Sequence, residues 1–491
     1  MTLIRSLVHA MTQYPGEIAI ADGENEYTYS MLDQVSAEIA GGLRARGIGP
    51  GDLVCLYSTR TWLRVCALMG AWRAGVGVVS IDPAQPRARV ERILNRVKPR
   101  LLLREPTVEE FDSNIPEVTY LGARGEASTE LVDGPIAYVV ATSGSTGEPK
   151  AVAAPPVVLA DLVEWHRTHW RHDAVPHTLN AAAVGFDVGY EEVASALVAG
   201  AKLVLVDDHQ RRDPFDLVDL ITIHQVARTF QPVGGLHGIA MAAAFSGAVP
   251  SLREIFVGGE RLVINDEVRK FCADNHIQLT NEYGPSETHV VMQYRLSGSP
   301  WEWPDHPPIG SVIASAEPLL VEDGVLRAFK RGEEGELVIA GRCVGLYYIG
   351  DEELTAQRFR ELPHEDGGVR RGYSTGDLVT YDGENFHFVS RVDDQLKVNG
   401  YRVEPGEVES VLTRLAGVRR IAVIGVGREA ATALVACYVR QDGAEVSEAD
   451  LRAACARELP EYMMPSHFRE FTSLPVNANG KVDRAAIRAQ F

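Results

Sequence analysis

The chain has 491 residues, 45% of them hydrophobic and 23% charged, which excludes collagen-like, low-complexity and wholly disordered proteins. Its 48 basic and 67 acidic residues give a formal net charge of −19, so no nucleic-acid partner is expected. Because six cysteines are scattered without a CxxC pair, no apolar run reaches the length of a membrane span and the N-terminus lacks a signal-peptide pattern, we expect a cytoplasmic protein with reduced thiols and no membrane partner.

Short β-branched runs alternate with amphipathic stretches along most of the first 400 residues. Residues 30–47 have apolar positions at three- and four-residue spacing and end in a glycine, which is typical of a helix. The runs typical of buried strands are residues 53–58, 76–82, 136–143 and 202–207. This alternation predicts an α/β fold with mostly parallel sheets.

The texture of the sequence changes twice toward the C-terminus. From about 300 to 390, glycine turns separate short strands, which predicts a small β-rich layer. The last hundred residues have their own pattern of a helix, two strands and a second helix. We therefore expect a large N-terminal domain, residues 1–392, and a small α/β C-terminal domain, residues 393–491.

The segment TSGSTGEPK, residues 142–150, directly follows one of the predicted strands. Its small residues let backbone N–H groups approach an anion, and its lysine adds a positive charge. A flexible surface turn is the alternative, but the strand before it and the lysine after it favour a phosphate loop. Pro149 and Ala151 exclude a Walker A motif. The expected phosphate contacts are Thr142, Ser143, Gly144, Ser145, Thr146 and Lys150.

Together with five other segments, this loop resembles the ordered motifs of adenylate-forming enzymes. The resemblance is strongest to the amino-acid-activating adenylation domains of nonribosomal peptide synthetases. It covers nearly the whole chain, with mild departures at Ala151, Ser390 and Asn399. The five segments are GAWRAGVGVVSIDP (70–83), NEYGPSETH (281–289), YSTGDL (373–378), SRVDDQLKVNGYRVEPGEVE (390–409) and NANGKVDR (477–484).

The resemblance implies a reaction in two halves, with ATP and Mg²⁺ as cofactors. A carboxylate attacks the α-phosphate of ATP to give an acyl-AMP and pyrophosphate, and a phosphopantetheine thiol then takes the acyl group. Because two anions must meet in the first half, the site has to neutralise their charge. Lys481 matches the catalytic lysine, and Asp393 matches the hinge about which the C-terminal domain rotates.

The resemblance also assigns nucleotide and metal contacts. Glu287 matches the Mg²⁺-binding carboxylate, which Thr146 would assist, since hard oxygen ligands suit this cation. Taken alone, each charged residue of this set would be more typical of a surface ion pair. The other expected contacts are Tyr283 with adenine, Gly259 and Glu260 beside it, Asp377 with the ribose hydroxyls, and Arg391 with ribose or phosphate.

The segment VGFDVGYEE, residues 184–192, resembles the motif that binds the substrate. Asp187 matches the acid that pairs with an α-ammonium group, which indicates an α-amino acid. The expected side-chain pocket holds two carboxylates without an evident partner, so we predict a basic amino acid of arginine, ornithine or lysine type. Proline or a related cyclic amino acid is the alternative, because FDV followed by ETHVV resembles prolyl-activating relatives. The expected pocket residues are Val188, Glu191, Val233, Phe256, Gly258, Glu282, Val290 and Val291.

Three histidines, His166, His169 and His172, lie at three-residue spacing on a predicted helix. They could share a face and bind a metal. Because no carboxylate is evident nearby, we favour an ordinary helix surface. We expect His289, beside the metal carboxylate, to pack in the pocket.

The leading interpretation is an enzyme that loads an amino acid on a separate carrier protein in antibiotic biosynthesis. No condensation, carrier or thioesterase segment fits in 491 residues, so we expect it to act in trans. A small MbtH-like helper is a further candidate partner. Two alternatives are a carboxylic acid–CoA ligase, against which Asp187 argues, and a catalytically silent nucleotide-binding or scaffold protein, against which Lys481 and Asp377 argue.

Overall fold

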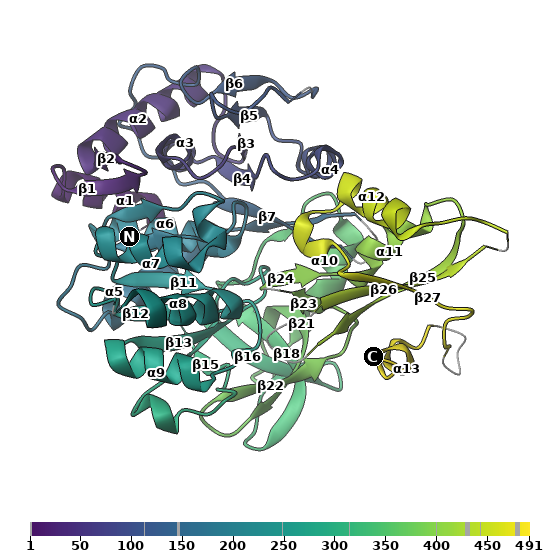
Figure 1. The fold of residues 1–491 in the computed structure, drawn as a ribbon. Coiled ribbons are helices and arrows are strands. Elements are labelled where there is room, and N and C mark those ends of the chain that lie inside the picture. The colour runs from purple at the N-terminus through teal and green to yellow at the C-terminus, as the bar shows by residue number, and fades with distance from the viewer. Residues whose placement is uncertain are drawn as a thin grey trace.

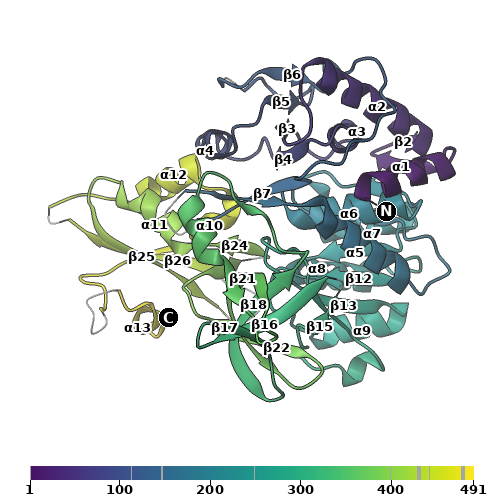
Figure 2. The same cartoon turned by 180° about the vertical axis from the view of Figure 1, so that it is seen from behind.

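A large N-terminal region and a small C-terminal domain make up the molecule (Figure 1). The computed structural model describes residues 2–111, 113–144, 148–247, 249–313, 315–398, 400–427, 433–441, 443–476 and 482–491, which form five β-sheets with helices around them. The view from behind shows the same division, with the C-terminal domain at the opposite side of the molecule from the N-terminal helix α1 (Leu3–Gln13) (Figure 2). No helix in the described ranges is both long and apolar enough to span a bilayer.

A nine-stranded sheet carries much of the candidate site. Its order is β15-β14-β13-β12-β11-β9-β10-β1-β2, and the pairs from β1 through β10, β9, β11 and β12 to β13 are all parallel. Both β11 and β12 are buried along their whole length, as parallel strands are when helices cover both faces. The strands are β1 (Ile18–Asp22), β2 (Asn25–Thr28), β9 (Thr178–Asn180), β10 (Leu203–Leu205), β11 (Arg228–Gln231), β12 (Glu254–Val257), β13 (Gln278–Tyr283), β14 (Met292–Arg295) and β15 (Ser311–Val312). The helices in this part of the chain are α5 (Pro156–His169), which precedes β9, and then α6 (Asp187–Val198), α7 (Pro214–Ile223), α8 (Val233–Ser246), α9 (Asp266–Asn275) and the short 3-10 turns η1 (Gln210–Arg212) and η2 (Pro300–Glu302).

A seven-stranded sheet provides the predicted phosphate loop. Its order is β19-β8-β7-β4-β3-β5-β6, and β7 and β8 pair antiparallel on either side of that loop, with Thr142 opposite Lys150. The strands are β3 (Leu53–Tyr57), β4 (Gly77–Ile81), β5 (Leu101–Arg104), β6 (Glu117–Thr119), β7 (Tyr138–Thr142), β8 (Lys150–Ala154) and β19 (Tyr347–Tyr348). The further helices here are α2 (Tyr29–Ala45), α3 (Trp62–Arg73) and α4 (Arg87–Val97). The helix and the buried strands predicted for this half of the chain are therefore confirmed.

An antiparallel layer follows, as the glycine turns predicted. Its order is β17-β16-β18-β21-β20, with β22 paired to β21 so that Asp377 lies opposite Arg391. The elements are β16 (Ala316–Glu322), β17 (Val325–Ala328), β18 (Glu333–Gly341), α10 (Glu352–Arg358), β20 (Phe359–Pro363), β21 (Val369–Tyr381) and β22 (Phe386–Arg391).

The C-terminal domain has its own core. Apolar residues of α11, β25, β26 and α12 pack together, and α12 begins at a capping box in which Ser447 and Asp450 satisfy each other's backbone amides. Its elements are the hairpin β23 (Leu396–Val398) and β24 (Tyr401–Val403), then α11 (Pro405–Thr413), β25 (Val418–Val426), β26 (Ala433–Arg440), α12 (Glu448–Glu458), η3 (Glu461–Met463), β27 (His467–Glu470) and α13 (Arg484–Arg488). The predicted fold class is thus confirmed in both parts of the chain.

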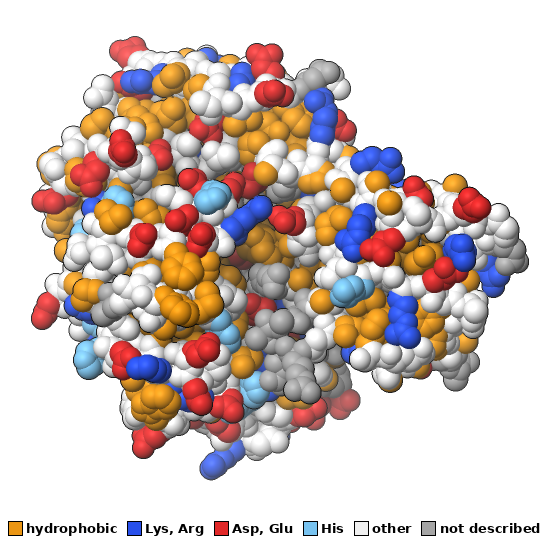
Figure 3. All heavy atoms as spheres, viewed as in Figure 1, with side chains coloured by type: hydrophobic (Ala, Val, Ile, Leu, Met, Phe, Trp, Pro, Cys, Tyr) orange, Lys and Arg blue, Asp and Glu red, His pale blue; other side chains and the backbone are white. Residues whose placement is uncertain are grey.

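Buried charges join the two parts. Arg89 on α4 forms an ion pair with Glu407 on α11, and both side chains are at most 1% exposed. Nearby, the Arg92 Nη1 atom lies 2.9 Å from the Glu458 Oε2 atom. In the space-filling view the C-terminal domain projects from one side of the large region (Figure 3). Because a buried ion pair is costly to break, these contacts favour one docked arrangement.

The turn after β13 requires a glycine. A Cβ atom at Gly284 would lie 1.7 Å from the carbonyl oxygen of His289, a distance no side chain tolerates. His289 itself has a φ of 58°, in the left-handed region. The backbone of residues 284–289 therefore closes on itself and fixes Glu287 between two constrained positions.

We predict that Gly284→Ala destabilises the N-terminal region by roughly 1–3 kcal/mol, because the backbone must move to admit the methyl group. Denaturant unfolding followed by circular dichroism measures the change. Gly16→Ala is the matched control, since no atom lies within 4 Å of a Cβ at that position. Equal unfolding midpoints for the two variants would show that the turn relaxes freely.

Candidate active site

A cavity of about 500 Å³ opens at the carboxyl ends of β11, β12 and β13. Parallel strands end at one edge of a sheet, and open α/β sheets bind their ligands there. The first turn of α6, the end of β21 and the β23–β24 hairpin form the other walls. The predicted site residues that line the cavity are Asp187, Val188, Phe256, Gly258, Gly259, Glu282, Tyr283, Val290, Asp377 and Arg391.

Other predicted residues are buried behind the cavity lining or lie outside the described ranges. Glu191, Val233 and Val291 are completely buried and are outside the cavity lining among the described residues. The Val233 amide donates to Glu260 at 3.2 Å, which ties the loop after β12 to the start of α8. Three of the predicted site residues lie outside the described ranges, namely Ser145, Thr146 and Lys481.

Tyr283 and Arg391 both hold the carboxylate of Asp377. The Tyr283 hydroxyl donates to the Asp377 Oδ2 atom at 2.6 Å, and the Arg391 guanidinium pairs with the Oδ1 atom. Burial raises the pKa of Tyr283 well above its ordinary value, so the phenol keeps its proton and remains a donor. Arg391 also donates from its Nε atom to Asp393 at 2.6 Å, so the predicted ribose acid and the predicted hinge residue share one guanidinium.

The predicted phosphate loop contacts the C-terminal domain. The Ser143 hydroxyl donates to the Arg402 carbonyl at 2.8 Å, and the Gly144 amide donates to Glu407 at 3.3 Å. The Lys150 Nζ atom lies 3.3 Å from the Glu404 Oε1 atom. Burial lowers the pKa of Lys150, and the nearby Arg402 lowers it further. Residues 402–407 thus present a carbonyl and two carboxylates to the donors expected to hold phosphates.

Glu287 lies at the centre of this interface and forms an ion pair with Arg402. Its two carboxylate oxygens each lie 3.0 Å from the Arg402 Nη1 atom, and the Tyr348 hydroxyl donates to it at 2.6 Å. Burial alone would raise the pKa of Glu287, but the Arg402 charge and the Tyr348 hydroxyl hold it below its ordinary value. A buried carboxylate that stays ionised, with a cation already against both oxygens, fits the Mg²⁺ ligand expected at this position.

The carboxylates of the expected side-chain pocket have partners, contrary to the sequence-based expectation. Glu191 hydrogen-bonds the His166 Nε2 atom at 2.7 Å, and Glu282 accepts from the Gln293 amide at 2.6 Å. His166 also packs edge-on against Phe256, with ring centroids 4.9 Å apart. The expectation was wrong because His166 and Gln293 come from α5 and β14, outside the motifs that defined the pocket.

The three histidines do not share one environment. His166 is buried on α5, whereas His169 is exposed and stacks on Trp165 at 4.3 Å. His172 lies beyond the last residue of α5, so the helical spacing does not continue to it. The nearby carboxylate that the sequence did not reveal is Glu191. His289 lines the cavity, as expected for a packing residue.

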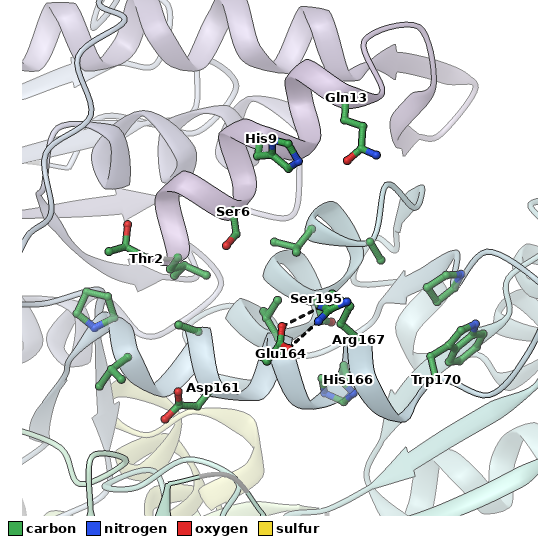
Figure 4. Close-up of a pocket in the computed structure, with 18 of the residues that line it drawn as sticks. Thr2, Ser6, His9, Gln13, Asp161, Glu164, His166, Arg167, Trp170 and Ser195 are labelled. Carbon is green, nitrogen blue, oxygen red and sulfur yellow. Dashed lines mark hydrogen bonds and ion pairs between the residues drawn. The ribbon is translucent and has the colours of Figure 1, made fainter.

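A second cavity, the α1–α5 groove, is lined in part by residues of helices α1 and α5. It has a volume of about 1240 Å³, and residues of α1 and α5 face one another across it (Figure 4). Both His166 and Arg228 belong to its lining. Arg228 donates to Thr178 and Ser195 at 3.0 Å. The groove and the candidate active site share no described lining residue, and His166, which lines the groove, packs against Phe256, which lines the active-site cavity.

Several residues that the structure brings to the site were not predicted as site residues from the sequence. Arg402, Glu404 and Glu407 stood inside the motif at 390–409, but nothing in the sequence showed that they meet the phosphate loop, which is more than 250 positions earlier in the chain. His166 stood in the histidine triplet, but neither its partner Glu191 nor the role of Gln293 was indicated, because their positions depend on how α5 and β14 pack.

Comparison with known proteins identifies two matching family models. Residues 7–349 match the model of the AMP-binding enzyme, and residues 407–481 match the model of the AMP-binding enzyme C-terminal domain. Tyrocidine synthase 2 of Brevibacillus parabrevis is 33% identical over 489 residues, which cover 96% of this chain and 13% of that protein. Gramicidin S synthase 2 of Brevibacillus brevis is 30% identical over 496 residues, 99% of this chain and 11% of that protein. The chain therefore spans little more than a tenth of the length of either relative.

Solved structures share the fold over nearly the whole chain. PA1221, described as a nonribosomal peptide synthetase protein containing adenylation and carrier-protein domains, is 26% identical with a TM-score of 0.84, covering 99% of this chain and 84% of that one. The amide bond synthetase McbA from Marinactinospora thermotolerans is 24% identical with a TM-score of 0.85, and the match covers 100% of both chains. The o-succinylbenzoate CoA synthetase of Bacillus subtilis is 21% identical with a TM-score of 0.83, over 99% of this chain and 98% of that one.

We predict that Arg402→Ala releases the C-terminal domain from its docked position. The substitution leaves the Glu287 carboxylate buried and unpaired, which costs about 3–5 kcal/mol in the docked arrangement. Small-angle X-ray scattering should show a larger radius of gyration, while Arg420→Ala, an exposed position of the same domain, should match the unaltered chain. Identical scattering from all three proteins would mean that this ion pair does not hold the domains together.

Proposed function

The chain belongs to the family of AMP-binding enzymes, and on that premise we propose that it activates an α-amino acid with ATP and loads it on a carrier protein. In the first half, an oxygen of the amino acid carboxylate bonds to the α-phosphorus and pyrophosphate leaves. In the second half, the carrier thiol loses its proton, its sulfur bonds to the acyl carbon, and AMP leaves. The chain's similarity to segments of the two peptide synthetases supports this reaction.

The observation that carries the proposal is the position of Asp187 in the same cavity as the expected nucleotide residues. Asp187 is at the first position of α6 and is 8% exposed, and it lines the cavity that Tyr283 and Asp377 also line. A nearly buried carboxylate needs a cation, and the α-ammonium group of an amino acid supplies one. The amino acid carboxylate would then be directed toward the nucleotide.

The remaining groups compensate the charge of the phosphates. Lys150 and the amides of residues 143 and 144 would bind phosphate oxygens after residues 402–407 withdraw from them. Glu287 would hold Mg²⁺, which when bound offsets the negative charge that develops on the phosphates. Lys481 is proposed as the catalytic lysine on the resemblance of its motif alone.

The carrier protein is proposed as a separate partner. PA1221 contains adenylation and carrier-protein domains in one protein, and this chain is 26% identical to it. A transfer to CoA or to an amine is the alternative, because a CoA synthetase and an amide bond synthetase share the fold. Asp187 favours the amino acid over a simple carboxylic acid in each case. A helper protein of the MbtH-like kind remains a proposed partner.

We propose a basic amino acid as the substrate, with proline or a related cyclic amino acid as the alternative. Glu282, an acid, lines the cavity, which favours a cationic side chain. The aromatic rings of Phe230 and Phe256, stacked 4.9 Å apart, provide an apolar wall that either substrate could use.

ATP–pyrophosphate exchange over the proteinogenic amino acids, ornithine and citrulline tests the function and its specificity. We expect the strongest exchange with ornithine, lysine or arginine. Asp187→Ala should lower it at least a hundredfold, because one desolvated ion pair to the α-ammonium group is lost. Asp219→Ala, an exposed acid on α7, is the control. Exchange with proline alone would replace the basic substrate by the cyclic one, and no exchange with any amino acid would overturn the function.

A substitution at Asp393 separates the two half-reactions. Asp393→Pro restricts the backbone at the proposed hinge, so we expect unchanged pyrophosphate exchange and at least tenfold slower transfer to the carrier. Asp393→Ala removes the hydrogen bonds to Arg391 but leaves the backbone free, and it shows how much of the effect comes from the side chain. Equal loss of both half-reactions in the proline variant would count against a hinge.

A further inference from the structure

Next to the cavity, and sharing Glu282 with its lining, lies a cluster of buried groups whose charges do not balance. The guanidinium of Arg228 faces four carboxylates, all of them on neighbouring elements. Arg295 lies 3.4 Å from one of them, Glu254, and Arg60, the other cation near this set, is paired with Asp208. Two arginines therefore face four acids in this part of the described structure. The acids are Glu191, Glu192, Glu254 and Glu282.

The excess negative charge is met by protons. Burial raises the pKa of Glu191 to about 7 and that of Glu192 to about 8, and it raises the pKa of Glu282 well above its ordinary value. Burial lowers the pKa of Arg228 only to about 10, so this residue stays charged. Near neutral pH the cluster therefore holds at least one proton that a cation could replace.

One member of the cluster reaches the substrate cavity. Glu282 lines the cavity with Asp187, and one carboxylate oxygen each of Glu282 and Glu191 and a ring nitrogen of His166 lie within 4.8 Å of one another. Phe256 packs beside this group and limits its access to water. A substrate held at Asp187 by its α-ammonium group would extend its side chain along this wall toward Glu282.

The opposite side of the cluster approaches the α1–α5 groove. His166 hydrogen-bonds Glu191 and also belongs to the lining of the groove (Figure 4). Burial lowers the pKa of His166 well below its ordinary value, so the ring is neutral and can pass a proton between its two nitrogens. The cluster thus has a connection toward solvent that does not cross the substrate cavity.

All ionisable groups near the cluster bear on its titration. In the described structure they are Tyr138 on β7, His166 and His169 on α5, Asp187, Glu191 and Glu192 on α6, Arg228 on β11, Glu254 on β12, Glu282 on β13, Arg295 on β14, Arg60 before α3, and His289 in the turn before β14. Most of the positive charge in this set is already paired with acids, so the remaining carboxylates still lack a cation that an added ligand could supply.

We propose that Glu282 and its cluster bind the distal cation of a basic amino acid in exchange for one proton, which leaves by way of Glu191 and His166 to the groove. The inference rests on the proposed function and specifies how the same site selects its substrate. The charges balance, since the cation brings one positive charge and the proton removes one. It also assigns His166, which the sequence marked only as one of three evenly spaced histidines, as a positioning residue.

Calorimetry on the unaltered chain tests the exchange directly. The probes are the sulfamoyl-adenosine derivatives of ornithine and of norleucine, which have side chains of equal length and differ in the terminal ammonium or methyl group. Titration at pH 7 in two buffers of different ionisation enthalpy gives the number of protons released. We expect about one proton for the ornithine compound, about none for the norleucine compound, and at least tenfold tighter binding of the former.

The pH dependence has a defined sign. Because the raised pKa values keep the cluster protonated at low pH, the KM for ornithine should fall as the pH rises from 6 to 8, while that for norleucine should stay level. Glu282→Gln should abolish the proton release, the preference for ornithine and this slope together. Glu267→Gln, an exposed position on α9, should retain all three.

Several outcomes overturn the inference while the proposed function stands. These are ornithine binding without proton release, tighter binding of the norleucine compound, or an unchanged preference in Glu282→Gln. Pyrophosphate exchange with proline or another neutral amino acid alone also overturns it. Failure of the proposed function is distinct, because then no amino acid supports exchange at all.

Discussion

Compensation of buried carboxylates is the constraint on which the candidate site depends. Asp377, Glu287 and Glu407 are each at most 3% exposed in their side chains, and each lies against an arginine. An isolated carboxylate in such surroundings would either take up a proton or cost several kcal/mol. The site therefore tolerates its acids only where a guanidinium, a proton or a ligand cation accompanies them.

This constraint connects the ligand site to the position of the C-terminal domain. Glu287 belongs to the large region and its partner Arg402 to the small domain, while Glu407 and Arg89 are divided the other way. Lys150 is likewise occupied by Glu404. A nucleotide with Mg²⁺ would bring its own phosphates and cation to these same groups. Bound ligand and docked domain thus draw on one set of charges, which gives a physical reason for the two to alternate.

Much of the fold and part of the site could be predicted from the sequence. Buried strands are continuous apolar runs, so those at 53–57 and 77–81 were evident, and local motifs predicted that Tyr283 and Asp377 lie together, as they do in the lining of one cavity. Contacts between distant elements could not be predicted, because they depend on packing. Arg402 meets Glu287 across 115 positions, and His166 reaches Glu191 only because α5 lies against α6. For the same reason the sequence could not reveal the partners of Glu191 and Glu282, which therefore looked unpaired.

In the proposed function, one cavity joins ATP and an α-amino acid. The most direct measurement is the mass of the small molecules that the chain retains after a single turnover with ATP, Mg²⁺ and an equimolar mixture of the proteinogenic amino acids and ornithine. We expect close to one equivalent of a single aminoacyl-AMP per chain, and none when the amino acids are omitted. Retention of ATP without any aminoacyl-AMP would contradict it.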